Sequence, residues 1–175
     1  SPLMHNFYAR RTGVNLAYVP FKVENEQVGD AVKGAFALNI LGMNVTVPHK
    51  QRVMEFLTDI DGDAKAIGAV NTLVRTEHGY KGYNTDAAGL TRALLGAGIH
   101  VGGERCILIG AGGAAKAAAY VLAKEGAASI YIMNRNLDRA QELAEYINRL
   151  VGRNLASALP LDGYESIPQE KGGYL

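Results

Sequence analysis

A glycine turn is the feature of this sequence whose residue types and spacing most directly suggest chemistry. Residues 110–115 read Gly-Ala-Gly-Gly-Ala-Ala, directly after the apolar run Ile107–Ile109 and before a helix-forming segment. There the first glycine permits a tight turn, the second lets backbone N–H groups approach a pyrophosphate, and a small third residue lets helix pack on strand. In preference to an ordinary turn, we expect a dinucleotide-binding site at Gly110, Ala111, Gly112, Gly113 and Ala114.

The end of the next predicted strand indicates which dinucleotide binds. An NAD site normally has an acidic side chain there, about 20 residues after the glycines, whereas an arginine accommodates the 2′-phosphate of NADP. This strand ends in Asn134-Arg135-Asn136 without a carboxylate at its tip, and Asp138 and Arg139 follow. A guanidinium binds phosphate through two parallel hydrogen bonds and can stack on adenine. The sequence therefore predicts NADP, bound by Asn134, Arg135, Asn136 and Arg139; two solvated arginines at the start of a helix are the alternative.

Polar side chains also gather in the first half of the chain, at the ends of apolar runs. Gly42–Lys50 places amide, hydroxyl and ammonium groups around a strand end that Pro48 terminates. Asn71-Thr72 and Asn84-Thr85-Asp86 repeat this combination. Strand ends and their loops are where rigid scaffolds present ligand-binding groups. The other interpretation is that these residues cap helices and turns.

Hydrophobic periodicity places these motifs on alternating helices and strands, so the predicted fold class is α/β. In the first half we expect helices at 1–13, 28–40 and 51–57, strands at 16–23 and 42–47, and a hairpin of 70–75 with 80–83. In the second half we expect, after a helix at 86–97, strand 106–109, a helix to residue 124, strand 129–133, helix 137–150 and a weak strand candidate at 155–161.

This order of elements predicts two domains. The βαβα order of the second half belongs, by the rules of handedness and burial, to a parallel sheet. We expect an N-terminal α/β domain at 1–86 and a Rossmann-type, doubly wound nucleotide-binding domain at 103–175, joined by a helix and turn at 87–102. A doubly wound sheet has three strands in each half, so we expect this domain to be incomplete.

Composition and charge exclude several classes of function. Lys and Arg total 18 against 17 Asp and Glu, so the net charge of +1 provides no field for nucleic acid or an anionic membrane. No apolar segment reaches the roughly 18 residues of a membrane span. The single cysteine, Cys106, cannot form an internal disulfide and suggests the reducing cytoplasm. Asp59–Asp63 lacks the later ligands of a calcium loop and the histidines lack ligand spacing, so no metal is expected.

The chain resembles the shikimate dehydrogenase family over residues 1 to about 150, because five motifs occur in that family's order. They are Gly42–Lys50, Gly68–Thr72, Gly82–Asp86, Gly110–Ala115 and Asn134-Arg135. Ser1–Asn6 is similar to the end of the family's serine-containing N-terminal motif. Members normally start earlier and continue past residue 175, so the resemblance implies that the extreme N-terminus and a C-terminal part are missing.

The resemblance implies an NADP-dependent oxidoreductase acting on a CH–OH group, which reversibly reduces 3-dehydroshikimate to shikimate in aromatic amino acid biosynthesis. Lys50 and Asp86 would be the catalytic pair, because an ammonium near a ketone stabilises and then protonates the oxygen as hydride adds. Asp86 would orient Lys50 or bind a ring hydroxyl. The implied substrate-binding residues are Ser1 for the carboxylate, with Thr46, Lys50, Asn71 and Asp86.

Three other functions stay open at this point. An NAD-preferring quinate/shikimate dehydrogenase would share the scaffold, but Arg135 in place of an acid argues against it. A methylenetetrahydrofolate dehydrogenase has a similar lysine-bearing domain, but the paired Asn-Thr motifs favour a polyhydroxylated acid over a pterin. A non-catalytic ligand sensor need not keep both Lys50 and Asp86. We expect a small-molecule partner, neither nucleic acid nor membrane, and a monomer or homodimer.

Overall fold

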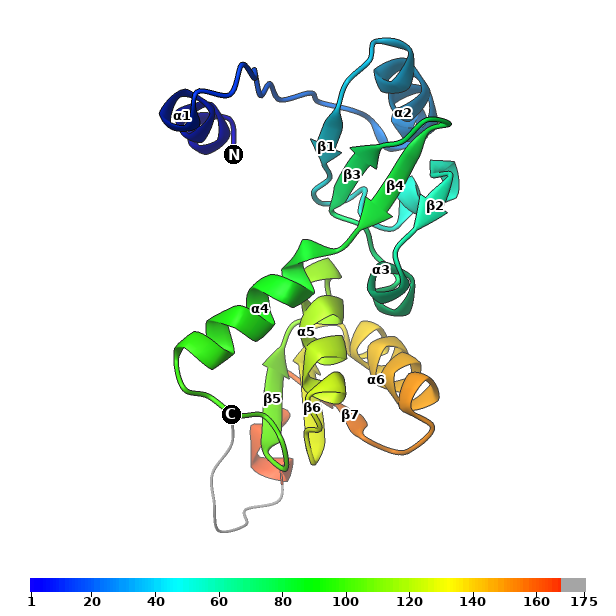
Figure 1. The fold of residues 1–175 in the computed structure, drawn as a ribbon. Coiled ribbons are helices and arrows are strands. Elements are labelled where there is room, and N and C mark those ends of the chain that lie inside the picture. Colours follow the sequence, from blue (N-terminus) through cyan, green and yellow to red (C-terminus); the bar gives the residue numbers. More distant parts are fainter. Residues whose placement is uncertain (168–175) are drawn as a thin grey trace.

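The computed structural model describes residues 1–167, and its strands form two separate sheets (Figure 1). The first sheet is mixed and the second is entirely parallel, with helices between the strands. The predicted α/β class is confirmed. The predicted second domain includes residues 168–175, which lie outside the described residues, and the proposed domain boundaries stay predictions.

The first sheet has the order β1-β3-β4-β2. Its neighbours are antiparallel except β2 and β4, which are parallel. The strands are β1 (Gly42–Asn44), β2 (Asp59–Ile60), β3 (Thr72–Arg75) and β4 (Tyr80–Tyr83). The helices of this half are α1 (Pro2–Thr12), α2 (Val28–Ala37), α3 (Gly62–Ile67) and the 3₁₀ helices Asn25–Gln27 and Arg52–Phe56.

A buried tyrosine anchors the core of this first half. Tyr80 on β4 is 1% exposed and packs among Val32, Val53 and Leu73. Its hydroxyl donates a hydrogen bond of 2.6 Å to the carbonyl of Ile40, just before β1. Burial raises the pKa of the phenol above its usual value. The hydroxyl therefore stays protonated and satisfies a carbonyl that the core would otherwise leave unpaired.

Replacing Tyr80 by phenylalanine should lower the free energy of unfolding by about 1–2 kcal/mol, because the Ile40 carbonyl loses its partner while the ring still fills its space. Urea denaturation measures the change. Tyr164→Phe is the matched control, because that ring is 60% exposed and its loss of a hydroxyl should change stability by less than about 0.5 kcal/mol. Equal effects of the two substitutions would contradict the prediction.

Three sequence predictions for this half were wrong in detail. Residues 16–23 form no strand, because the backbone N–H and carbonyl of Tyr18 are bonded to the Asn6 side chain instead of to a neighbouring strand. The strand predicted at 42–47 ends at Asn44, since only three of its residues pair with β3. The helix predicted at 51–57 is a 3₁₀ helix, and β2 and α3 were not predicted.

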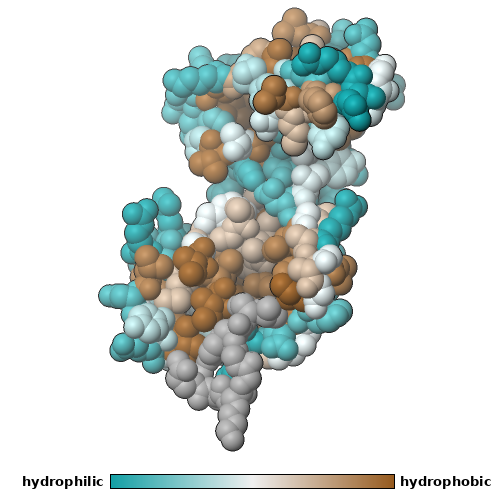
Figure 2. Space-filling view, turned by 90° about the vertical axis from the view of Figure 1, so that its left-hand side faces the viewer, coloured by the Kyte–Doolittle hydropathy of each residue, from teal (hydrophilic) through white to brown (hydrophobic). Residues whose placement is uncertain are grey.

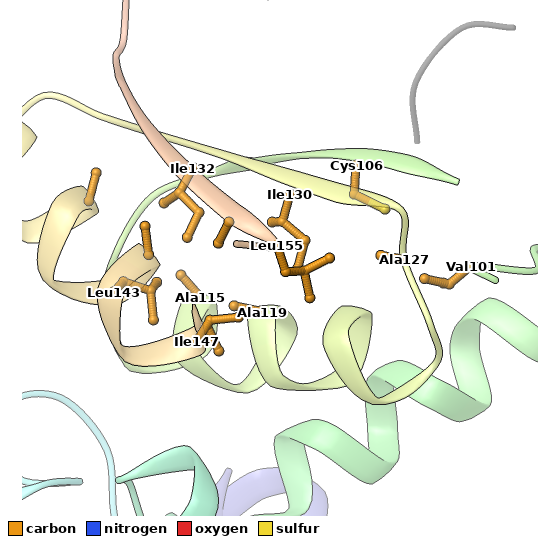
Figure 3. Packing of buried hydrophobic residues seen from close by; sticks show 13 residues of the cluster. Val101, Cys106, Ala115, Ala119, Ala127, Ile130, Ile132, Leu143, Ile147 and Leu155 are labelled. Carbon is orange, nitrogen blue, oxygen red and sulfur yellow. The ribbon is translucent and has the colours of Figure 1, made fainter. Parts of the chain in front are cut away.

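The second sheet has the order β5-β6-β7 and is parallel throughout. Its strands are β5 (Arg105–Ile109), β6 (Ser129–Asn134) and β7 (Ala156–Pro160), which confirms the weak candidate at 155–161. Helices α5 (Gly113–Lys124) and α6 (Leu137–Val151) cover one face, and the 3₁₀ helix Gly163–Ser166 follows β7. Figure 3 shows Ile130 and Ile132 of β6 pointing toward Leu143 and Ile147 of α6.

Helix α6 is built as an amphipathic helix whose ends are specified locally. Asn136 accepts a hydrogen bond from the backbone N–H of Arg139 at its start, and Gly152 ends it at φ 69°, where a side chain would be strained. Asn148, near its end, bonds the backbone of Leu155 and Ala156 with three hydrogen bonds of 2.7–2.9 Å. Through these bonds, α6 holds β7 at the edge of the sheet.

The two halves meet through α3, α4 (Thr85–Gly96) and α5. A small apolar cluster fills this junction, with Ile67 and Ala69 on one side and Ala117 and Val121 on the other. Figure 2 shows the halves joined through a narrow waist. No helix within residues 1–167 is long and apolar enough to cross a membrane.

Candidate active site

The structure brings Lys50 and Asp86, predicted as a catalytic pair, into direct contact. Lys50 Nζ donates a hydrogen bond of 2.6 Å to Asp86 Oδ2. The lysine side chain is 15% exposed and the aspartate side chain 34%, so the pair is largely buried but still accessible to solvent. Lys50 ends the turn after β1, whereas Asp86 lies in the first turn of α4, whose N-cap is Asn84 and not Asp86 as the sequence suggested. Asp86 is therefore free to bind side chains.

Asn71 is the centre of the polar network around this pair. Its Nδ2 donates to the second oxygen of Asp86 at 2.8 Å. Its Oδ1 accepts from Thr72 Oγ1 at 2.9 Å and from the backbone N–H of Thr85 at 3.0 Å. Asn71 is 8% exposed, and the backbone N–H of its neighbour Val70 bonds the carbonyl of Lys50. Asn71 therefore orients the carboxylate and joins β3 to the start of α4.

Replacing Asn71 by alanine should lower the free energy of unfolding by about 1–3 kcal/mol, because the substitution leaves buried donors and an acceptor without their partner. Chemical denaturation measures this loss. Asn15→Ala supplies the control, because Asn15 is exposed and its side chain makes no hydrogen bond to a described residue. A stability equal to that of the control would show that Asn71 does not hold this network.

Two residues that the sequence predictions did not include extend the network. Asn44 on β1 donates to Thr72 at 3.3 Å and accepts from the hydroxyl of Tyr18 at 3.0 Å. A chain of side-chain hydrogen bonds therefore runs from Tyr18 to Asp86. Asn44 belongs to a polar motif that the sequence had singled out, but no local signal indicated that the chain returns at Tyr18.

Two predicted substrate-binding residues do not join this network. Thr46 is exposed in the turn between β1 and Lys50, and its carbonyl accepts from the backbone N–H of His49. Ser1 precedes α1, which lies to one side of the first sheet (Figure 1). Ser1 is exposed and its side chain makes no capping hydrogen bond. The structure thus places Thr46 near Lys50 in the chain but does not bring Ser1 to the pair.

The glycine turn has the geometry expected of a phosphate site. Gly110 has φ 112°, a conformation that L side chains rarely adopt, and its N–H bonds the carbonyl of Met133 on β6. Gly112 is the N-cap of α5 and supplies no side chain to the free N–H groups of that helix. A methyl group built on Gly110 or Gly112 would meet nothing within 4 Å. The N-terminal end of α5, a 12-residue helix, therefore has no side-chain cap and has open space beside Gly112 that an anion can enter.

One cavity connects the glycine turn with Lys50. Its volume is about 440 Å³, and its lining includes Lys50, Gly112, Gly113 and Arg139. A methyl group on Gly113 would lie 3.4 Å from Lys50 Cδ, so the lysine stem lies against the start of α5. Lys50 of one half and the glycine turn of the other thus line the same cavity.

The predicted 2′-phosphate residues lie at the tip of β6. Asn134 donates to the carbonyl of Asn136, which caps α6, and this fixes the turn between them. Arg135 and Arg139 are both exposed and form no ion pair with any described residue. Arg139 lines the cavity, whereas Arg135 does not. The uncapped α5, the absence of an acid at the tip of β6 and these two free guanidinium groups fit a dinucleotide with a phosphorylated ribose.

Other reactive groups contribute little to this site. No group of three or more His, Cys, Asp or Glu side chains within residues 1–167 could hold a metal ion. Cys106 is buried on β5, and burial raises the pKa of its thiol, so the nucleophilic thiolate is disfavoured. The groups of this site that can take part in chemistry are therefore the Lys50 ammonium, the Asp86 carboxylate and the backbone N–H groups at the start of α5.

Two family models match the chain. Residues 1–73 match the shikimate dehydrogenase substrate binding domain, and residues 93–164 match a model described as shikimate / quinate 5-dehydrogenase. The first match contains Lys50 and Asn71, and the second contains the glycine turn and Arg135. Asp86 lies between the two matches.

Curated proteins and solved structures agree with these models. The chain is 51% identical over 148 residues to a shikimate dehydrogenase (NADP(+)) of Desulforamulus reducens, covering 84% of this chain and 51% of that protein. A Listeria monocytogenes shikimate 5-dehydrogenase in complex with shikimate and NAD superposes with a TM-score of 0.84 at 32% identity, covering 94% and 58% of the two chains. The Thermus thermophilus shikimate 5-dehydrogenase in complex with NADP(H) and shikimate superposes with a TM-score of 0.78 at 32% identity, covering 91% of this chain and 57% of that chain. The chain spans about half the length of these relatives.

Proposed function

The chain belongs to the shikimate dehydrogenase family, and on that premise we propose that the protein carrying it reversibly reduces 3-dehydroshikimate to shikimate with NADPH. The observation that carries this proposal is the shared cavity, which is lined by Lys50 of one half and by the Gly112-Gly113 turn of the other. A substrate bound beside Lys50 can thus meet the reactive end of a nucleotide bound at the turn. This step belongs to aromatic amino acid biosynthesis.

Lys50 would act as the general acid in the direction of reduction. NADPH, when bound, supplies the hydride to the carbonyl carbon. As that bond forms, negative charge develops on the carbonyl oxygen, and an ammonium within hydrogen-bond distance stabilises it and gives it a proton. In the oxidation of shikimate, the Lys50 amine takes the proton back from the hydroxyl.

Asp86 and Asn71 would hold Lys50 ready for this transfer. The carboxylate bonds the ammonium at 2.6 Å through one oxygen and Asn71 at 2.8 Å through the other. Asp86 also presents acceptor oxygens to a ring hydroxyl. We propose Ser1 and Thr46 as further substrate contacts, because the family resemblance assigns them to the carboxylate and the ring.

The remaining proposals concern organisation and cofactor. Residues 1–86 would bind substrate, 87–102 would connect, and 103–175 would bind NADP through the turn at 110–114 and the residues Asn134, Arg135, Asn136 and Arg139. The named ligand of the Thermus relative, NADP(H), supports this cofactor. The free thiol of Cys106 supports a reducing compartment such as the cytoplasm.

The Listeria relative supports a second candidate, an enzyme that prefers NAD, because its structure contains NAD and shikimate. Initial rates with shikimate and with quinate, each with NADP and with NAD, separate the candidates. We expect shikimate-dependent formation of NADPH that is faster than any other combination. A preference for NAD would overturn the cofactor assignment. Binding of both ligands without turnover would identify a ligand sensor in place of an enzyme.

A further inference from the structure

Helix α5 contacts the first half of the chain at two levels. Its first residue, Gly113, faces Lys50 at the site. About 10 Å further along the helix axis, given the 1.5 Å rise per residue, Tyr120 and then Lys124 meet Asp63 of α3. Between these levels, Ala117 and Val121 are buried in the junction cluster. One face of α5 therefore lies against the substrate half along most of the helix.

The second level is a compact polar cluster, which we call the α3 clamp: Asp63, Tyr120 and Lys124. The Tyr120 hydroxyl donates to Asp63 Oδ1 at 2.7 Å, and Lys124 Nζ lies 3.2 Å from both carboxylate oxygens. The hydrogen bond from Tyr120, helped by Lys124, lowers the pKa of Asp63 below its usual value, against the effect of burial. Burial, with the bond to Asp63, raises the pKa of Tyr120. The carboxylate therefore stays ionised and the phenol stays protonated at neutral pH.

Helix α3 connects the α3 clamp to the catalytic pair, because the residues that follow the helix bond Lys50 and Asp86. The helix is capped by Gly68, and the next three residues bond the site. The carbonyl of Ala69 accepts from the Asn84 side chain, and the N–H of Val70 donates to the Lys50 carbonyl. Asn71 then bonds Asp86. A second bond, from the hydroxyl of Tyr146 on α6 to the carbonyl of Ala66 at 2.8 Å, also ends on α3.

From this arrangement we propose that the α3 clamp positions the nucleotide half against the substrate half, so that Asp63, Tyr120 and Lys124 are positioning residues for hydride transfer. This inference rests on the proposed function. The small apolar cluster serves as a pivot, and the waist between the halves is narrow (Figure 2). Bonds on one side of a pivot set the tilt of α5, and that tilt sets the distance from the glycine turn to Lys50. Misplacing reactants by about 1 Å can cost roughly 10²-fold in rate.

The kinetic test uses Tyr120→Phe, which keeps the ring and removes only the hydroxyl. We expect kcat to fall roughly three- to tenfold, the range that one lost hydrogen bond of this kind represents. The KM values for shikimate and NADP should change less than about twofold, because each set of predicted ligands lies within one half. The deuterium isotope effect on kcat, measured with shikimate labelled at the oxidised carbon, should rise as hydride transfer becomes slower. Tyr8→Phe is the control, because that exposed ring lies on α1.

A merely structural role predicts different results. Partial unfolding would lower the concentration of NADP-binding sites and leave the isotope effect unchanged, and this result would overturn the proposal. Asp63→Asn gives an independent check, since it keeps an acceptor for Tyr120 but removes the charge that holds Lys124. Asp63→Asn should lower kcat less than the double substitution of Tyr120→Phe with Lys124→Met. Wild-type kinetics in both Tyr120→Phe and Asp63→Asn would also overturn the proposal.

An experiment without turnover separates the clamp from the proposed function. Spin labels at Lys33→Cys on α2 and Gln141→Cys on α6 report the distance between the halves, and the native Cys106 is buried away from the label. Pulsed electron paramagnetic resonance should give a narrow distance distribution that broadens in Tyr120→Phe. An unchanged distribution would contradict the clamp, whereas a broadened one in a protein without shikimate activity would refute only the proposed function.

Discussion

Replacing Lys50 by methionine should lower the turnover of shikimate by roughly 10²- to 10⁴-fold, the range attributed to a positioned acid or base. Methionine keeps an unbranched stem against Gly113 but removes the ammonium that bonds Asp86. No other lysine lies in this network to replace it: of the described side chains, only Lys50 donates an ammonium proton to Asp86. In the oxidation of shikimate, the hydroxyl would then have no base to take its proton as the hydride leaves.

Steady-state rates with shikimate and NADP measure this effect, and NADP binding measured by fluorescence shows whether the nucleotide half stays intact. Lys33→Met is the matched control, because Lys33 is an exposed lysine of α2 that forms no ion pair with a described residue. Lys50→Arg tests the mechanism further, since arginine keeps the charge but does not readily release a proton. Near-normal turnover in Lys50→Met would remove Lys50 from the mechanism.

The second half of the fold follows closely from its sequence because its signals are local. Strong hydrophobic periodicity marks α6, β-branched residues mark β6, and glycines mark the turn and the helix end. The first half was harder to predict. Its strands have two to four residues, too few for a periodic pattern, and the apolar residues of 16–23 resemble a strand although their backbone has no strand partner among the described residues.

The same distinction applies to the site. Lys50, Asn71 and Asp86 were found because each lies in a motif that resembles the family's, and the structure brings the three together. Tyr18 was not found, because its role depends on a side-chain contact with Asn44, 26 residues away. The clamp was missed for a similar reason: Asp63 and Tyr120 are 57 residues apart, and each alone resembles an ordinary surface residue. The contact between Asp63 and Tyr120 depends on how the two halves pack together.

Removing both arginines at the tip of β6, with Arg135→Ala and Arg139→Ala, should raise the KM for NADP by roughly 10²- to 10⁴-fold. Each guanidinium offers charge-assisted hydrogen bonds to a 2′-phosphate, and such bonds contribute about 1.5–3 kcal/mol each. Both side chains are exposed and form no ion pair within residues 1–167, so their loss leaves no buried charge behind. The KM for NAD, which lacks this phosphate, should change less than about threefold.

The ratio of kcat/KM values for NADP and NAD, measured with saturating shikimate, tests this assignment. Arg92→Ala controls for the loss of positive charge, because Arg92 is an exposed arginine of α4 that forms no hydrogen bond or ion pair with its side chain in the described part of the chain. The single variants distinguish the two residues: Arg139 lines the cavity beside Gly112, whereas Arg135 lies outside it. If Arg135→Ala alone leaves the ratio unchanged, Arg139 holds the phosphate from within the cavity. If the double variant weakens NADP and NAD equally, the two arginines attract the cofactor through its pyrophosphate and do not select NADP.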